Sequence, residues 1–376
     1  RSDVLPTGRN LYAVDPRGVP SRAAHAQGVK LAEELLRRHL QDNGDWPRGL
    51  VIDLWGSATM RTAGEEVAMA MHLAGLAPKW DEGSERVSGF EVLPLTLLDR
   101  PRIDVTLRIS GLFRDVFPGL GQIFEAGAAA LAEREEAPDM NPYLTRTPRV
   151  FGPKPGLYGV NMEAALQDYS DAGRAAAGEA WLSGSEWAIN AQGEAHKDRA
   201  ALEAQLHRAD GFAHVQDLAE SDILLASDYA SHEGGFAAAM AHLGAQKPAM
   251  YHLDHTRAGS PRARSMPEEI ARVVRARAAN PGWASGMMRH GFRGAAEVAA
   301  TLDNLAAFAH LTREVPAHLF DLYFDATLGR DDLVAFMEVE NPAALQAMRD
   351  RFAALRDAGL WVTRRNSISA NLDGVE

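Results

Sequence analysis

The sequence predicts an α/β protein in which mostly parallel strands are flanked by helices and a mainly helical region follows toward the carboxyl end. Three observations favour this fold class. Short apolar runs such as Leu50 to Leu54 have the length of strands that are covered on both faces. These runs alternate with helix-like segments, as they do in proteins with parallel sheets. Beyond Ser265, helix signals continue with hardly another strand-like run.

The elements of the first part alternate in type. Helix 21–41 carries its leucines on one face and its charged residues elsewhere. Residues 103–109 alternate between apolar and polar side chains, which predicts a strand. The full expected order is helix 21–41, strand 50–54, helix 65–75, a short strand around 79–80, a weaker strand at 90–93, strand 103–109 and helix 115–134.

The remaining elements have weaker patterns. They are a helix over 162–184, an exposed excursion over 184–197, helix 198–208, strand 212–216, an alanine-rich helix after Phe236, strand 248–254, helices from 265 onward and a short extended piece at 360–362. Ser265 and Glu268 have capping-box spacing, and Asn341-Pro342 predicts an N-cap. We expect three domains, namely an α/β domain at 1–150, a second α/β segment at 151–262 and a helical region at 263–376.

Composition excludes several classes of protein and of site. The 376 residues carry a formal net charge of -12, whereas a nucleic-acid-binding surface needs a basic patch. No cysteine is present, which excludes disulfides and thiolate sites and suits a cytoplasmic protein. No apolar run reaches the ~18 residues of a membrane span. The chain also lacks a G-x-x-x-x-G-K-[ST] phosphate-binding loop, an H-E-x-x-H zinc motif and a G-x-S-x-G nucleophile motif.

The most informative stretch runs from Leu50 to Glu66. A buried strand ends at Trp55, a polar loop follows, and Thr62 and Glu65 have the spacing of a capping box at a helix start. Ligands bind outside the carboxyl ends of strands in open α/β sheets, so this loop, with Arg61 in it, is a candidate site. Four strand ends are expected to face one crevice, namely Trp55-Gly56-Ser57, Ser110-Gly111, Gln216-Asp217 and Asp254-His255.

Each candidate also has a purely structural interpretation, in which the side chain serves only a helix end or a surface ion pair. These alternatives are a capping box of Thr62 with Glu65, an N-cap at Ser110 before a tight left-handed turn at Gly111, surface ion pairs of Arg108 or Arg114 with Asp104 or Asp115, and a helix cap at His232. From the residues alone, the function is therefore no more specific than an α/β protein with a polar crevice.

A series of motifs runs in order along nearly the whole chain, namely Pro6-Thr7-Gly8-Arg9-Asn10, Asp53-Leu54-Trp55-Gly56, Arg61-Thr62-Ala63-Gly64-Glu65, Arg100 to Val105, Ile109 to Asp115, Arg149 to Pro153, Ala276 to Trp283 and Arg289-His290-Gly291. Together they resemble the large subunit of aerobic cobaltochelatase, of which the large subunit of magnesium chelatase is a relative. Ala63 and the double glycine at 234–235 favour the cobalt branch. The pattern departs at His255, because the resemblance implies threonine directly after Asp254.

The resemblance implies ATP-dependent insertion of cobalt(II), the substrate metal, into hydrogenobyrinic acid a,c-diamide during cobalamin biosynthesis. The large subunit would bind this tetrapyrrole, a corrinoid precursor. An AAA+ ATPase motor and its companion subunit would hydrolyse ATP, which agrees with the missing phosphate-binding loop. The chain would be the carboxyl-terminal part of this ligase, inactive without its partner subunits and its amino-terminal part.

The resemblance also implies roles for particular residues. Metal insertion removes protons from pyrrole nitrogens and water from Co²⁺, which needs a base and transient metal ligands. Glu65 is the predicted base or metal relay, and His232 is a predicted transient cobalt ligand. The predicted substrate-binding residues are arginines for peripheral carboxylates, aromatic residues for the macrocycle and one serine, namely Arg61, Arg108, Arg114, Trp55, Phe113, Tyr158 and Ser110.

Two other functions stay open. In the first, the chain, and especially the helical residues 265–376, is a non-catalytic docking module for the AAA+ motor. In the second, the chain is part of a magnesium chelatase. Binding of a corrinoid precursor rather than of a porphyrin distinguishes the cobalt enzyme from the magnesium enzyme.

Overall fold

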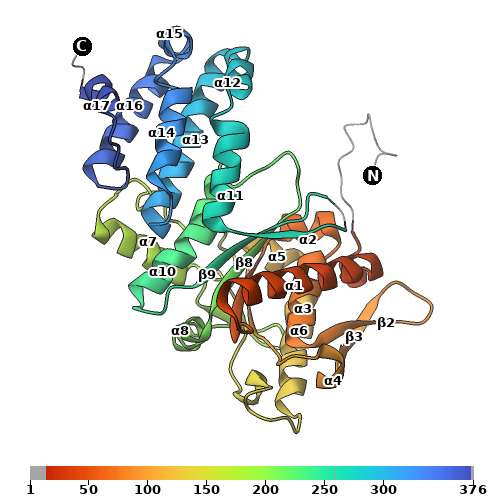
Figure 1. The fold of residues 1–376 in the computed structure, drawn as a ribbon. Coiled ribbons are helices and arrows are strands. Elements are labelled where there is room, and N and C mark those ends of the chain that lie inside the picture. Colours follow the sequence, from red (N-terminus) through yellow and green to blue (C-terminus); the bar gives the residue numbers. More distant parts are fainter. Residues whose placement is uncertain (1–13, 258, 374–376) are drawn as a thin grey trace. The chain divides into compact units, whose positions relative to one another are not determined.

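The computed structural model describes residues 14–257 and 259–373, and it confirms the predicted fold class (Figure 1). The motif Pro6 to Asn10 lies outside the described residues. The chain forms two compact units. The first contains residues up to Gly159 together with 183–217 and 253–263, and the second contains 160–182, 218–252 and the residues from 264 on. The division into domains at 1–150, 151–262 and 263–376 stays a prediction.

One large, mostly parallel sheet has eight strands in the order β10-β9-β8-β1-β4-β5-β6-β7. Strand β1 pairs in parallel with β4 and β8, and β4 pairs in parallel with β5, whereas β5–β6 and β6–β7 are antiparallel. The strands are β1 (Gly49–Leu54), β4 (Asp104–Ile109), β5 (Val150–Gly152), β6 (Trp187–Ile189), β7 (Ala195–Lys197), β8 (Gly211–Gln216), β9 (Ala249–Asp254) and β10 (Arg262–Ser265). Strands β2 (Leu76–Trp80) and β3 (Val87–Val92), predicted as short strands, form a separate antiparallel pair.

Strand β1 is the best predicted element of the sheet. All six of its residues are buried, as its apolar run indicates for a strand covered on both faces. Its register runs from Gly49 opposite Asp104 to Leu54 opposite Ile109. Both of its neighbours are parallel to it, so the ends of β1, β4 and β8 lie at the same edge of the sheet.

The helices of the first unit surround these strands. They are α1 (Arg22–Asn43), α2 (Gly56–Thr62), α3 (Glu65–Ala74), α4 (Leu95–Leu98), α5 (Gly111–Val116), α6 (Pro118–Ala132) and α8 (Arg199–Arg208). Helix α1 begins at the N-cap Ser21 and ends at Gly44, which is left-handed at φ 79°. It packs closely on α3, because a Cβ on Gly28 would lie 2.6 Å from Ala68 Cβ.

Four predictions for the first unit are wrong in whole or in part. The stretch after Gly56 is the short helix α2 rather than a polar loop, and α3 begins after Gly64 without a capping box between Thr62 and Glu65. The helix expected over 115–134 is divided into α5 and α6 because Pro118 cannot continue the hydrogen-bond ladder. Residues 184–197 are only in part an exposed excursion, because β6 and β7 extend the sheet and Ala188 and Ile189 are buried, whereas residues 192–194 and 196–197 are exposed.

The second unit is mainly helical, as predicted. Its helices are α7 (Asp171–Ser183), α9 (Ser227–Tyr229), the π-helical turn η4 (Ala230–Gly234), α10 (Gly235–His242), α11 (Met266–Val273), the π-helical turn η5 (Val274–Ala278), α12 (Pro281–Met288), α13 (Gly291–Thr312), α14 (Ala317–Ala326), α15 (Asp331–Glu340), α16 (Pro342–Asp357) and α17 (Asn366–Asp373). The capping box of Ser265 with Glu268 and the N-cap at Asn341 are confirmed. Only 171–183 of the helix predicted over 162–184 is helical, and residues 360–362 form no strand.

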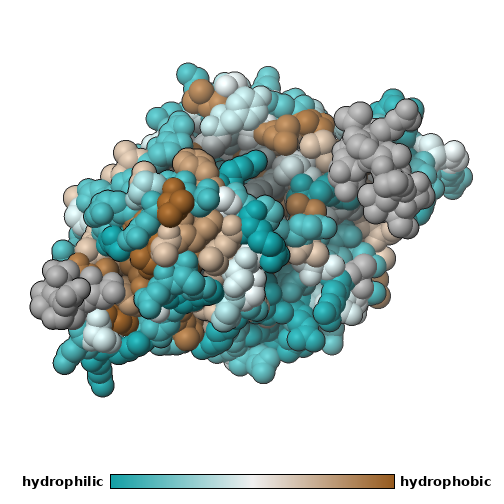
Figure 2. Space-filling view, turned by 90° about the horizontal axis from the view of Figure 1, so that it is seen from above, coloured by the Kyte–Doolittle hydropathy of each residue, from teal (hydrophilic) through white to brown (hydrophobic). Residues whose placement is uncertain are grey.

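The surface carries charged and apolar side chains side by side. Figure 2 shows a face on which hydrophilic residues cover most of the area and hydrophobic residues form smaller areas between them. Among residues 14–257 and 259–373, no helix combines the length and the apolar character that crossing a membrane requires.

Candidate functional site

Charged side chains meet inside the first unit near the carboxyl ends of β1, β4 and β8. The register places Asp53 of β1 beside Arg108 of β4, and Arg108 Nη1 donates to Asp53 Oδ1 at 3.4 Å. Arg108 Nε donates to Ser185 Oγ at 3.2 Å, and His214 Nδ1 of β8 lies 3.5 Å from Asp53 Oδ2. Burial lowers the pKa of Arg108, and Asp53 opposes that shift. Arg108 is thus an internal partner of Asp53, and the alternative of a surface pair with Asp104 is wrong.

Trp55 lies against this buried group at the end of β1. Its indole Nε1–H donates to Asp53 Oδ2 at 2.5 Å, and its ring centroid lies 4.7 Å from that of His214. Trp55 is itself only half-buried. The strand core therefore fixes the indole in place while part of it stays accessible to a ligand.

Ser110 joins the ends of β1 and β4. Its Oγ accepts from Gly56 N at 3.1 Å and from Phe113 N at 3.2 Å, so the structural interpretation of Ser110 as the N-cap of α5 is confirmed. Gly111 is not left-handed, and the predicted tight turn is wrong. The reason for glycine is close approach, because a Cβ at this position would lie 2.6 Å from Tyr158 Cδ1.

Arg61 forms a two-bond ion pair at the same edge. It lies in the last turn of α2, and its Nε and Nη2 donate to the two carboxylate oxygens of Asp217 at 2.6 and 2.9 Å. Asp217 directly follows β8, so the pair joins one of the four predicted strand ends to the helix that follows β1. The side chains are 22% and 13% exposed, which leaves the guanidinium within reach of a ligand.

Glu65 pairs with His255, which follows β9. His255 Nδ1 lies 2.5 Å from Glu65 Oε2, and the backbone N–H of Gly259 donates to His255 Nε2 at 3.4 Å. Because Nε2 accepts that bond, Nδ1 carries the proton and donates to Glu65. Among the described residues, Glu65 Oε1 has no hydrogen-bond partner. One oxygen of Glu65 is therefore oriented by His255 and the other is left for a ligand.

The neighbouring acid Glu66 points inward instead. Its carboxyl group contacts the hydroxyl groups of Thr59 at 2.5 Å and Thr62 at 2.9 Å. Burial raises the pKa of Glu66, and the threonine hydrogen bonds oppose that shift. Thr62 Oγ1 also accepts from the backbone N–H of Glu65 at 3.3 Å, so one half of the predicted capping box is present. The other half is absent, because the Glu65 carboxylate pairs with His255.

Arg114 lies in the last turn of α5 and uses only part of its guanidinium for hydrogen bonds within the described residues. Its Nε donates to Asp115 Oδ1 at 2.7 Å, and its Nη1 donates to the carbonyl groups of Pro153 and Lys154 at 3.1 and 3.0 Å. Within the described parts of the chain, Arg114 Nη2 is buried without a partner. Arg114 borders a cavity of about 230 Å³. The surface alternative is confirmed for its pair with Asp115, and Nη2 is available for an anion.

The aromatic residues predicted to hold a ligand differ in exposure. Phe113 is fully buried and packs on Phe117, with ring centroids 5.8 Å apart. Tyr158 is exposed, donates its hydroxyl proton to Asp115 and lies 5.7 Å from the Arg114 guanidinium. Leu112, next to Phe113, is exposed as well. Phe113 therefore supports the loop from inside, whereas Leu112 and Tyr158 offer apolar surface.

His232 lies in the second unit, on the π-helical turn η4. Such turns are frequent at functional sites. The turn continues directly into α10, so the interpretation of His232 as a helix cap is wrong. His232 is buried, and its carbonyl oxygen accepts from Trp181 Nε1 at 3.0 Å. Glu65 and His232 belong to different units, and their joint role at a metal stays a prediction.

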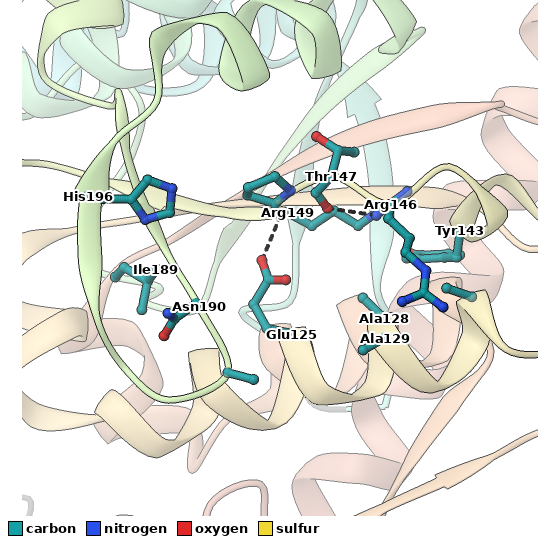
Figure 3. Close-up of a pocket in the computed structure, with 13 residues that line it drawn as sticks. Glu125, Ala128, Ala129, Tyr143, Arg146, Thr147, Arg149, Ile189, Asn190 and His196 are labelled. Carbon is teal, nitrogen blue, oxygen red and sulfur yellow. Dashed lines mark hydrogen bonds between the residues drawn. The ribbon is translucent and has the colours of Figure 1, made fainter.

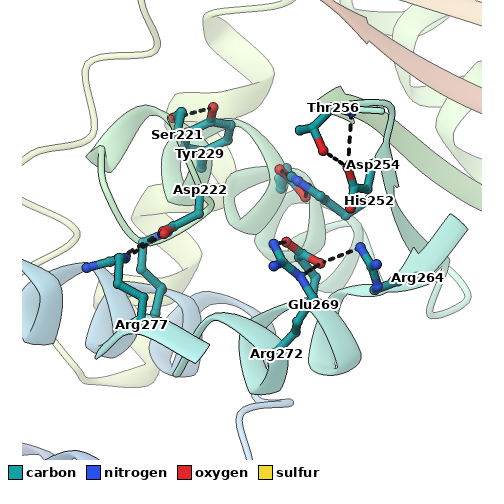
Figure 4. A network of polar contacts seen from close by, with 12 residues as sticks. Ser221, Asp222, Tyr229, His252, Asp254, Thr256, Arg264, Glu269, Arg272 and Arg277 are labelled. Carbon is teal, nitrogen blue, oxygen red and sulfur yellow. Dashed lines mark hydrogen bonds and ion pairs between the residues drawn. The ribbon is translucent and has the colours of Figure 1, made fainter. Parts of the chain in front are cut away.

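Two buried glutamates of the second unit, Glu233 of η4 and Glu269 of α11, are paired with basic side chains. His252 Nδ1 lies 3.2 Å from Glu233 Oε1, and both side chains are fully buried. Glu269 accepts from Arg264 Nη1 at 3.1 Å and from Arg272 Nε at 2.9 Å (Figure 4). Burial would raise the pKa of Glu269, but its hydrogen bond to Arg272 and the nearby positive charges outweigh burial and lower it.

A further cavity of about 310 Å³ lies at the opposite, amino-terminal edge of the first unit's strands (Figure 3). Glu125 of α6 faces it, and one of its oxygens accepts from the backbone N–H groups of Arg149 and Val150 at 2.6 and 2.7 Å. Burial raises the pKa of Glu125 to about 7. Glu125 thus holds the first residues of β5.

Several polar residues of these clusters lay beyond the predicted site. Asp53 and His214 lie inside apolar strands, and that position was the available signal, because buried ionisable groups are rare without a partner. His255 was expected at one of the four strand ends and as a departure from a motif, but without a role or a partner. Asp217 was expected at the crevice without a partner, and the structure supplies Arg61. In the described part of the chain, no three His, Asp or Glu side chains converge to hold a metal ion.

Known proteins resemble the chain over its whole length. The profile of the CobN/Magnesium Chelatase family matches residues 1–368. The aerobic cobaltochelatase subunit CobN of Sinorhizobium sp is 42% identical over 100% of this chain, and that of Pseudomonas aeruginosa is 41% identical over 96%. A magnesium-chelatase subunit of Rhodobacter capsulatus is 27% identical over 96%. Each alignment covers 31% of the relative.

A solved structure agrees with the fold in detail. The catalytic subunit of cobaltochelatase from Mycobacterium tuberculosis superposes with a TM-score of 0.93 at 34% sequence identity. The match covers 99% of this chain and 33% of that one. The chain therefore spans about a third of the length of the proteins it resembles.

Proposed function

Because this chain belongs to the CobN/magnesium chelatase family, we propose that it is the tetrapyrrole-binding part of a cobaltochelatase large subunit. The proposed reaction inserts Co²⁺ into hydrogenobyrinic acid a,c-diamide on the route to cobalamin in the cytoplasm. An AAA+ motor and its companion subunit would supply ATP hydrolysis. The chain spans about a third of its relatives, so turnover is proposed only for the complete subunit with its partners.

The observation that carries this proposal is the set of side chains near the carboxyl-terminal edge of the first unit's strands. A half-buried indole, a part-exposed guanidinium and a carboxylate with one oxygen unpartnered among the described residues lie in the segment that follows β1, at Trp55, Arg61 and Glu65. A tetrapyrrole is flat and largely apolar and carries carboxylates at its periphery. Aromatic surface suits its plane, and guanidinium groups suit its carboxylates through paired hydrogen bonds.

The proposed roles of the arginines follow their surroundings. Arg61 would exchange Asp217 for a substrate carboxylate, since both bind through the same two donors. Arg114 would add its unused Nη2 donor, beside the exposed ring of Tyr158. Ser110, Phe113 and Arg108 are proposed as positioning residues, because their side chains fix the strand ends from inside.

Glu65 is the proposed proton acceptor. Insertion releases protons from pyrrole nitrogens, and the unused Oε1 of Glu65 would take one of them while His255 Nδ1–H holds the other oxygen. His232 is proposed as a transient ligand that replaces water on Co²⁺, since cobalt accepts imidazole ligands.

The proposal is tested by titrating the purified chain with hydrogenobyrinic acid a,c-diamide and following the quenching of its seven tryptophans. Protoporphyrin is the comparison ligand. We expect saturable, corrinoid-selective quenching that weakens at least about tenfold in Arg61→Gln, since charge-assisted hydrogen bonds are lost.

The matched control is Arg48→Gln. Arg48 pairs with Asp210 as Arg61 pairs with Asp217, through two carboxylate oxygens, but before β1 rather than after it. Equal weakening in both variants would contradict a site at the carboxyl-terminal edge. Preference for protoporphyrin would favour the magnesium branch.

The docking function is the second candidate because the helical region exposes large apolar side chains. Phe292 and Val339 are 63% and 81% exposed, and Asn341 Nδ2, from the segment after Val339, donates to Phe292 O at 3.4 Å. Such side chains suit a protein partner. Retention of the AAA+ motor by the folded chain, with no tetrapyrrole quenching, would favour docking.

A further inference from the structure

A cavity of about 280 Å³ lies within the second unit, separate from every residue of the candidate site. Helices α7 and α10, the start of β9 and the end of α13 contribute to its wall. Its apolar lining consists of Ala237, Met240, Ala241, Ala245, Pro248 and Met250. The wall therefore suits the hydrocarbon part of a small ligand.

Three cationic side chains border this cavity, against one acid, Glu314. Lys247 pairs with Glu314 and is 73% exposed, and Arg313 Nη2 lies 3.2 Å from Asp171, whose side chain is fully exposed. Arg174 is half-buried, and its Nε donates to Leu311 O at 2.9 Å. Among the described residues, the two Nη groups of Arg174 have no hydrogen-bond partner, so they are free to bind an anion.

The pKa values of two residues near this cavity are lowered by burial and by the positive charges around them. The pKa of the buried His310 is lowered to about 4 by burial and then by the charges of Arg313 and Arg174, with Asp168 opposing. The pKa of Arg174 is lowered by burial and by Arg313, although Asp171 opposes. Asp168 and Asp171 lie outside the lining, in which three side chains are positive and one is negative, whereas the chain as a whole carries a formal net charge of -12.

We propose that this cavity is a binding site for a small organic carboxylate, whose apolar body contacts Met240 and Met250 and whose carboxylate binds Arg174. A guanidinium with both Nη groups free binds a carboxylate through two parallel hydrogen bonds. The size of the cavity fits a ligand at the small end of the range for protein pockets. This inference does not rest on the proposed chelatase function.

Isothermal titration calorimetry of the purified chain tests the proposal with 4-phenylbutyrate as the probe. The comparison ligands are 4-phenylbutylamine, with the same body and the opposite charge, and inorganic phosphate, an anion without an apolar part. We expect one saturable site for 4-phenylbutyrate. We expect no measurable binding of the amine, which the cations repel, or of phosphate, which leaves the apolar wall unused.

Three variants locate the site, each checked for folding by circular dichroism. Arg174→Gln should weaken binding at least about tenfold through loss of charge-assisted hydrogen bonds. Ala237→Phe fills the cavity and should abolish binding while leaving the guanidinium in place. Arg349→Gln removes an exposed charge from the same unit outside the cavity and should change nothing.

Three results would overturn the proposal. They are no binding of 4-phenylbutyrate, equal binding of the amine, and binding by the Ala237→Phe variant at the wild-type affinity. If Arg174→Gln does not fold, the other two variants still test the proposal. Binding should then be lost in Ala237→Phe and unchanged in Arg349→Gln.

Discussion

Arg102 and Arg149, at the amino-terminal edge of the first unit's parallel strands, lie inside the protein, whereas Arg61 and Arg114, at the carboxyl-terminal edge, are only part-buried. Arg149, before β5, is only 2% exposed, and its Nε donates to Asp104 Oδ1 at 2.7 Å. Its remaining donors bind the carbonyl groups of Pro142, Thr145 and Thr147. Arg102 likewise binds Glu136 and three backbone carbonyl groups.

At the carboxyl-terminal edge the arginines also pair with carboxylates and carbonyl groups, but these hydrogen bonds leave part of each guanidinium accessible or without a partner. Arg61 is 22% exposed and faces a carboxylate that a ligand carboxylate can replace. Arg114 keeps a buried Nη2 without a partner in the described residues. From this contrast we infer that a motif rich in arginine indicates a binding site only under one condition. The guanidinium must either pair with a carboxylate that a ligand can replace or keep a donor that has no partner. Arginines whose donors are bound to internal carboxylates and backbone carbonyl groups, as in Arg102 and Arg149, hold loops in place.

The largest expected effect on stability comes from removing the buried ion pair of Arg149 with Asp104 at the amino-terminal edge. Arg149→Met leaves Asp104 buried without its cation and removes the donors to three carbonyl groups. We expect the free energy of unfolding, measured by urea titration, to fall by about 3–5 kcal/mol. The control Arg48→Gln breaks an exposed pair at the same edge and should cost less than about 1 kcal/mol. Similar losses in the two variants would contradict the contrast between buried and exposed pairs.

The second prediction is that the ionisation of Glu125 makes the free energy of unfolding depend on pH. Its pKa is about 7 in the folded chain, above the ordinary value of 4.5, so the folded state keeps the proton that the unfolded state has released. Its contribution to stability is therefore full below pH 4.5 and is lost as the pH rises toward 7, by about 3 kcal/mol in all.

Glu125→Gln keeps an oxygen for the N–H groups of Arg149 and Val150 but cannot ionise. In urea unfolding the variant should match the wild type near pH 4.5 and exceed it in stability at pH 8. Parallel pH profiles for the two proteins would show that Glu125 ionises normally.

The third prediction moves to the carboxyl-terminal edge. Glu65→Gln keeps an oxygen to accept from His255 Nδ1–H, so folding should change little. Cobalt insertion by the complete subunit with its partners should fall about a hundredfold, as expected for loss of a general base. Glu66→Gln is the matched control, because the neighbouring carboxyl is buried against Thr59 and Thr62. Unchanged insertion in Glu65→Gln would remove Glu65 from the mechanism.

The sequence predicted the strands and polar residues of the carboxyl-terminal edge better than it predicted which of these residues pair with each other. Strand β1 and the polar strand ends followed from local patterns of burial and turn residues. The pairs themselves join residues far apart in sequence, such as Glu65 with His255 at a separation of 190 residues and Arg61 with Asp217 at 156. Local spacing favoured Thr62 as the partner of Glu65. Thr62 accepts from the Glu65 backbone N–H, but the Glu65 carboxylate pairs with the distant His255.

The missed elements have a related physical cause. Strands β6 and β7 contain three residues each, too few to show an alternating pattern, and their pairing with β5 gives them their place. Arg108 looked like a surface charge because its partner Asp53 lies 55 residues earlier, inside another strand. Burial of a charge depends on such tertiary partners, which local spacing does not contain.

The smallest expected effect is on ligand binding in Asp217→Asn. This variant tests whether Asp217 competes with a ligand for Arg61. Asp217→Asn removes the competing negative charge, so hydrogenobyrinic acid a,c-diamide should bind about threefold to fivefold more tightly, a change of about 1 kcal/mol for one part-exposed pair. Asp210→Asn removes the matching partner of Arg48 at the amino-terminal edge and should leave binding unchanged. Tryptophan quenching measures both. Weaker binding in Asp217→Asn would mean that the aspartate positions Arg61 for the ligand, and the two edges would then use their carboxylates alike.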